Sequence, residues 1–187
     1  MDDEIFIILD KIIDNKFKIS NSGGKIIVQE KDNRGECKEV KITTNNKVFA
    51  LSLDNNYKVF NCFNSSEKNI TTKNDGVIFF IKSNKLIVLL VELKSKNTTG
   101  YLKQLKAGKN FIEYLLKQVN LLYHINIDSC NVIFRAILFD TNNRKVIPKG
   151  TTHRIKLKFI NRNNLLCASL NCNASYKLQM IKESIEF

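Results

Sequence analysis

The sequence predicts an α/β domain in which a central mixed β-sheet is flanked by helices. Hydrophobic residues make up 43% of the 187 residues, enough to bury the core of a single domain spanning residues 1–187. Apolar residues recur at helical spacing in three segments and at strand spacing in several others. Helix-type and strand-type segments follow one another as α, several β, α, β, β, α, which is typical of a mixed sheet covered by helices.

The first part of the chain is predicted to form one helix and several short strands. Apolar positions from 4 to 17 repeat every three or four residues, which predicts a helix capped by Asp2 or Asp3. A polar loop is expected over residues 65–74. Turn residues separate four strand-type runs, at Lys25–Glu30, Glu36–Ile42, Lys47–Leu53 and Tyr57–Phe63.

A buried hairpin and a long helix are predicted next. Gly76–Lys82 and Leu86–Leu93 are apolar at successive positions, a pattern typical of strands covered on both faces. The helix should run from about residue 100 to 120, with Thr98 or Thr99 as its N-cap. The rest of the chain predicts strands at Asn131–Phe139, His153–Ile160 and Leu165–Leu170, and a final helix over Tyr176–Ile185.

Composition narrows the class of partner. Thirty basic residues against eighteen acidic ones give a net charge of +12, which favours nucleic acid or another anionic partner. Lys and Asn are abundant, as in proteins of AT-rich genomes, so the positions of the charges carry more weight than their total. No apolar run approaches the roughly 20 residues of a membrane helix. The acidic start differs from a signal peptide, so we expect a cytoplasmic protein with no membrane contact.

The cysteines predict no zinc site. The five cysteines and two histidines lack the spacings of zinc ligands, and reduced thiols in the core are the expectation. A catalytic Cys-His pair stays open, although no pattern indicates one.

Two carboxylates and a lysine are predicted to meet at one end of the hairpin. If Ser83 and Asn84 form a two-residue turn, Asp75 lies opposite Glu92, and Lys94 points to the same side. Opposed carboxylates repel each other, and a hard cation such as Mg²⁺ or Mn²⁺ relieves that repulsion. The metal would activate a water for attack on a phosphodiester, with Lys94 beside it. The alternative is a structural hairpin in which Lys94 neutralises Glu92 and Asp75 serves as a turn residue.

These residues resemble a known active-site signature. Asp75-Gly76 with Glu92-Leu93-Lys94 is similar to the motif of the PD-(D/E)XK, or restriction-endonuclease-like, nuclease superfamily, over about residues 70–140. The resemblance implies a strand-strand-helix-strand core and a Mg²⁺-dependent endonuclease that acts on DNA more often than on RNA, in host defence or DNA processing. Asp75 and Glu92 would bind the metal, and Lys94 would serve the water.

The match to the signature has three departures. Asn74 stands where the motif has Pro. Gln104 matches a glutamine on the helix of some members, but Gly108 stands where those members have Tyr. Others carry a further glutamate on their first helix, for which Glu4 is the candidate here.

Basic residues predict the nucleic-acid contacts. Arg154, Lys156 and Lys158 share one face of the predicted strand 153–160, and Lys103 and Lys106 lie on the long helix. Arg135 is an edge residue or points toward the site. The alternative to a nuclease is a nucleic-acid-binding, assembly or immunity protein that retains the fold without cleavage. A homodimer and a complex with another subunit both remain open.

Overall fold

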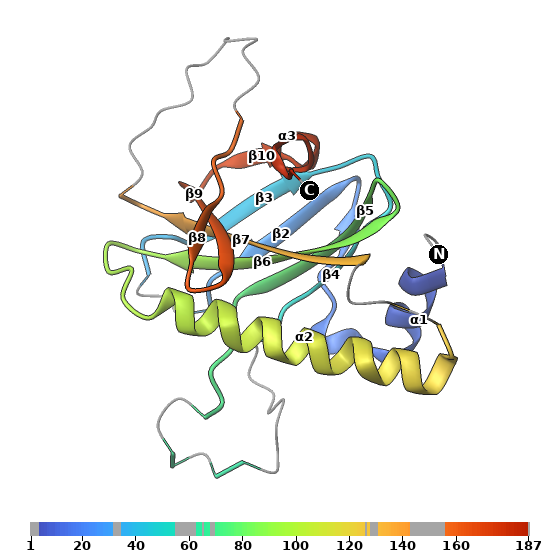
Figure 1. The fold of residues 1–187 in the computed structure, drawn as a ribbon. Helices are drawn as coiled ribbons and strands as arrows, with labels where there is room; N and C mark the ends of the chain where they lie inside the picture. The colour runs from blue at the N-terminus through green and yellow to red at the C-terminus, as the bar shows by residue number, and fades with distance from the viewer. Residues whose placement is uncertain are drawn as a thin grey trace.

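The computed structural model describes residues 4–31, 35–54, 63–64, 66–67, 70–125, 127, 131–142 and 156–186. Within these ranges the predicted α/β class is confirmed, because helices pack against two sheets that each contain parallel and antiparallel pairs (Figure 1). No helix in the described ranges combines the length and apolar character needed to cross a membrane.

The larger sheet has six strands in the order β4-β5-β6-β7-β9-β8. They span Phe49–Leu51 (β4), Gly76–Lys82 (β5), Lys85–Lys94 (β6), Val132–Asp140 (β7), Ile160–Arg162 (β8) and Leu165–Asn171 (β9). Strands β6 and β7 are parallel, and the helix α2 (Tyr101–Tyr123) makes the crossover that parallel neighbours require.

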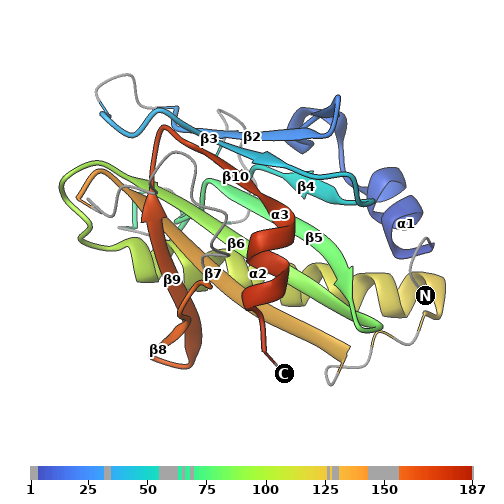
Figure 2. The same cartoon turned by 90° about the horizontal axis from the view of Figure 1, so that it is seen from above.

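A second sheet covers the face opposite α2, where the sequence predicted helices alone (Figure 2). Its order is β1-β2-β3-β10, with β10 parallel to β3. The elements of this layer are Asn21–Ser22 (β1), Lys25–Gln29 (β2), Glu39–Thr43 (β3), Ser175–Lys177 (β10) and the helix Leu178–Ser184 (α3).

The strand β6 separates two hydrophobic cores. Leu89, Val91 and Leu93 face the second sheet and α3, while Val88 and Leu90 face α2 and the helix α1 (Glu4–Ile12). This double coverage confirms the prediction from the uninterrupted apolar runs. The same alternation puts Glu92 and Lys94 on the α2 face.

The predicted register of the hairpin is confirmed. Lys82 pairs with Lys85 and Gly76 with Val91, around a turn in which Ser83 and Asn84 have φ of 49° and 58°. Positive φ at both central residues matches the right-handed twist of the two strands. Asp75, one residue before β5, therefore continues the ladder opposite Glu92.

Several predicted boundaries were wrong for local reasons. The helix α2 is capped by Gly100, with φ of 82° and no side-chain hydrogen bond, rather than by Thr98 or Thr99. Residues 156–159 are not a strand, since the Leu157 N–H donates to Ser184 Oγ instead of to a neighbouring strand. The last helix begins after Tyr176, which pairs with β3.

The first helix also ends earlier than predicted, at Ile12. A separate 3₁₀ turn, η1 (Asn15–Phe17), follows because the Asp14 side chain accepts the Lys16 N–H. The predicted cap at Asp2 or Asp3 and most of the predicted strand Tyr57–Phe63 lie outside the described residues.

Candidate active site

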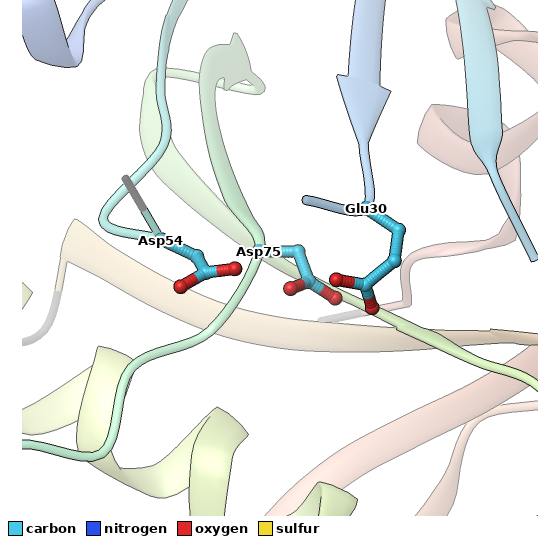
Figure 3. Close-up of side chains that lie close together, drawn as sticks. All are labelled: Glu30, Asp54 and Asp75. Carbon is cyan, nitrogen blue, oxygen red and sulfur yellow. The ribbon is translucent and has the colours of Figure 1, made fainter. Parts of the chain in front are cut away.

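Three carboxylates from different elements converge at one end of the sheets. Glu30 directly follows β2, Asp54 lies beyond β4, and Asp75 directly precedes β5. Their side chains point toward one another in Figure 3, with one carboxylate oxygen of each within 4.8 Å of the other two. We call Glu30, Asp54 and Asp75 the acidic cluster.

Asp75 is held in place by the hairpin that it begins. It is 3% exposed, and its Oδ2 accepts the Leu93 N–H at 2.5 Å. The preceding Asn74 is fully buried, and its Nδ2 donates to the carbonyl oxygens of Gly76 at 2.5 Å and Val91 at 3.3 Å. Asn74 therefore ties β5 to β6 beside the carboxylate, at the position where the nuclease signature has Pro.

Without a bound cation, ionising all three carboxylates of the acidic cluster is energetically unfavourable. Burial raises the pKa of Asp75 to about 7, against the hydrogen bond from Leu93, and the charges of Glu30 and Asp54 add to the rise. Burial also raises the pKa of Asp54, with a further contribution from Glu30. A cation held between these groups would offset the burial and the repulsion together.

Glu92 and Lys94 form an ion pair beneath this cluster. Glu92 is fully buried, and its Oε1 lies 2.6 Å from Lys94 Nζ. Burial, then the negative charge of Asp75, raises the pKa of Glu92 to about 9. Burial opposes the charge of Lys94 as well, but the neighbouring Glu92 outweighs it, so the pKa of Lys94 is raised. Lys94 is therefore protonated at neutral pH.

A cleft of about 490 Å³ opens over these groups. The acidic cluster and Lys94 form part of its wall, and Gly100, Lys103 and Gln104 from the start of α2 form another part. The structure thus brings four predicted residues to one cleft: Asp75, Lys94, Lys103 and Gln104. Glu92 does not line the cleft, but its ion-pair partner Lys94 does.

Gly108 allows α2 to lie close to the hairpin. A Cβ on this residue would lie 2.1 Å from Asn74 Oδ1, so a side chain does not fit there. A tyrosine, which some proteins with the resembled signature carry at this position, would clash with Asn74 here. Gln104, one helical turn earlier, remains at the cleft.

Other predicted residues lie elsewhere. Lys156 forms an ion pair with Glu186, and Arg154 lies outside the described residues. Residues 156–159 are not a strand, but Lys156 and Lys158 are both exposed and flank the buried Leu157. Neither these lysines nor Lys106 is among the described residues that line the cleft.

Two further expectations are corrected or narrowed by the structure. Arg135 is an edge residue rather than part of the cleft lining: it pairs with Leu89 of β6, but the ladder from β7 to β9 begins only at Ala136. Its guanidinium donates to the carbonyl oxygens of Phe134 and Glu186 at 2.9 and 2.8 Å. Arg135 therefore binds the backbone of the C-terminal segment at Glu186. Glu4 is exposed in the first turn of α1 and is not part of the acidic cluster.

Sequence reasoning missed Glu30 and Asp54. Glu30 is the last residue of one predicted strand, and Asp54 directly follows another. Their only signal is an acidic residue after an apolar strand, which is common at turns. Their approach to Asp75 depends on the packing of β2 and β4 around β5.

No family model, curated protein or solved structure matches this chain.

Proposed function

We propose that this chain is a metal-dependent nuclease that hydrolyses phosphodiester bonds, with DNA the favoured substrate. The observation that carries the proposal is the convergence of the acidic cluster and Lys94 on one cleft. The order β5-β6-α2-β7 supports it, because this is the strand-strand-helix-strand order that the resemblance implies for a restriction-endonuclease-like core.

The acidic cluster fits Mg²⁺ or Mn²⁺ by the chemistry of its donors. Both ions prefer carboxylate oxygens and retain coordination positions for water and phosphate. Asp75 would be the central ligand, with Glu30 and Asp54 beside it. Glu92, the second ligand implied by the resemblance, stays a prediction, since its carboxylate engages Lys94 in this structure. A bound ion would supply Lewis-acid polarisation and a more acidic water.

Lys94 would act as a hydrogen-bond donor in this mechanism. A protonated ammonium has no lone pair, so it cannot take a proton from the attacking water. Its place beside Asp75 suits stabilisation of the negative charge that builds on the phosphate oxygens. Glu92 positions this ammonium from behind.

The start of α2 would bind and orient the substrate. Lys103 offers a charge to a phosphate, and Gln104 offers an amide to a phosphate oxygen or the attacking water. The N-terminus of a helix of 23 residues adds a favourable dipole for an anion beside these side chains.

A cleavage assay tests the proposal. Plasmid DNA, single-stranded DNA and RNA would be incubated with Mg²⁺, Mn²⁺ or chelator, using the wild type, Asp75→Asn and the exposed control Glu4→Gln. We expect metal-dependent cleavage by the wild type and the control, and a loss of at least about 100-fold in Asp75→Asn. Cleavage in chelator, or full activity of Asp75→Asn, would contradict the proposal.

One observation favours the alternative of a binding protein without cleavage. The ion pair of Lys94 with Glu92, at 2.6 Å, is what a purely structural hairpin would contain. In that case the protein binds nucleic acid in the same assay but leaves every substrate intact with either metal.

A further inference from the structure

Cys37 and Cys172 come together although they are distant in the sequence. Cys37 lies just before β3, and Cys172 directly follows β9. Beyond the effect of burial, Cys172 raises the pKa of Cys37, and Cys37 lowers the pKa of Cys172, as neighbouring thiols do. Both residues are unbonded thiols that pack in the core between the two sheets.

The backbone around the two thiols is fixed on both sides. Asn173, next to Cys172, donates through Nδ2 to the Glu36 carbonyl at 2.7 Å, and its Oδ1 accepts the Lys38 N–H at 2.8 Å. The Asn173 N–H donates to the Glu39 carbonyl at 2.9 Å. The residues before and after Cys37 are therefore bound by the neighbour of Cys172, which places the two cysteines side by side in the fold.

We propose that Cys37 and Cys172 form a redox modification site that closes to a disulfide when a peroxide oxidises it. The Cys172 thiolate attacks one peroxide oxygen, the O–O bond breaks, and water leaves behind a sulfenic acid on Cys172. The Cys37 sulfur then attacks the Cys172 sulfur, the S–S bond forms, the S–O bond breaks, and a second water leaves. Two thiols are oxidised by two electrons, and the peroxide is reduced to two waters.

The two thiols differ in access, which sets their order of reaction. Cys37 is 1% exposed, whereas Cys172 is half-buried and open to a small oxidant. Burial raises the pKa of both thiols, and the neighbouring Cys37 partly offsets the rise at Cys172. Cys172 therefore reacts first, and oxidation should accelerate as the pH rises.

The bond would join the two sheets close to the candidate active site. The N–H groups of Glu36 and Cys37 donate to Ser95 Oγ at 2.7 and 3.3 Å, one residue beyond Lys94. Cys37 also donates to the Phe139 carbonyl at 3.6 Å, on the neighbouring strand β7. The disulfide would fix this segment against the ends of β6 and β7, independently of whether the protein cleaves nucleic acid.

Thiol mapping tests the proposal. The full-length protein would be treated with hydrogen peroxide across pH 6.5–8.5, digested without reductant and analysed by mass spectrometry. We expect a cross-linked peptide joining Cys37 to Cys172, lighter by two hydrogen atoms and reversed by dithiothreitol. The Tm of the intact oxidised protein should rise by about 5 °C or more, because the bond closes a long loop of the unfolded chain.

Two variants complete the design. In Cys172→Ser, oxidation should leave the Tm unchanged and yield no cross-link to Cys37. The triple variant Cys62→Ser, Cys130→Ser, Cys167→Ser should still form the bond. A wild type in which Cys172 is oxidised alone to a sulfinic acid, with Cys37 still a free thiol, would overturn the proposal.

Discussion

Lys94 and Glu92 are joined by 2.6 Å between Nζ and Oε1, yet only the lysine of this pair reaches the cleft. The glutamate is fully buried and holds the ammonium from behind, beside Asp75. An ion pair in this position either orients a catalytic cation or merely stabilises the hairpin. Substituting Glu92 and Lys94 one at a time distinguishes these two roles.

Glu92→Gln should change the pH dependence of stability in the absence of metal. The pKa of Glu92 rises from an ordinary 4.5 to about 9 in the folded protein, so folding retains a proton that the unfolded chain releases between these values. Wild-type stability should therefore fall as the pH rises through this window. The glutamine removes this loss, and the variant should be more stable by roughly 1–4 kcal/mol at pH 8 and nearly equal at pH 4.

Urea unfolding in chelator at pH 4, 6 and 8 measures the difference. A variant that is less stable than the wild type at every pH would instead support a structural ion pair.

Lys94→Met should remove cleavage while preserving the metal site. Methionine keeps most of the apolar stem of the lysine, and an ammonium is not a metal ligand. We expect cleavage to fall by at least about 100-fold, and Mn²⁺ affinity measured by titration calorimetry to be unchanged or tighter. If the variant retains wild-type cleavage, Lys94 has no part in the reaction.

Glu30→Gln and Asp54→Asn should each weaken Mn²⁺ binding by about tenfold or more, because each removes one charged oxygen ligand. Glu4→Gln is the matched control, an exposed carboxylate outside the acidic cluster. Titration calorimetry or Mn²⁺ electron paramagnetic resonance would measure the affinities. Wild-type affinity in the Glu30→Gln, Asp54→Asn double variant would place the metal elsewhere.

Gly108→Ala should destabilise the fold by about 1–3 kcal/mol, since the new Cβ would lie 2.1 Å from Asn74 Oδ1. Asn110→Ala, on the exposed face of the same helix, controls for helix propensity and should be neutral or slightly stabilising. Chemical denaturation measures both. A stable Gly108→Ala protein would show that α2 can move away from the hairpin at little cost.

Lys103→Gln should weaken nucleic-acid binding and reduce the salt slope by about 0.9, the effect of losing one phosphate contact. Lys156→Gln is the matched control, because its charge is already engaged by Glu186 and it lies outside the cleft lining. Fluorescence anisotropy at several salt concentrations gives both slopes. Equal slopes for the two variants would move the phosphate contacts away from the cleft.

Local patterns in the sequence were sufficient to predict the hairpin and the residues on it. Apolar runs of strand length and the Ser83-Asn84 turn determined the register, and the period of two along each strand then related Asp75, Glu92 and Lys94. The crossover helix followed from its period of 3.6. These features depend on neighbours close in the sequence, which is why they could be predicted without a structure.

The tertiary structure alone decided which distant groups meet. Glu30 and Asp54 reach Asp75 only because β2 and β4 pack around β5, and Cys37 reaches Cys172 only because β10 returns beside β3. The choice of sheet partner for each of these segments depends on side chains far away in the sequence. No local pattern marks the acidic cluster or the thiol pair, because the packing of two sheets is a property of the whole chain and leaves no local periodicity.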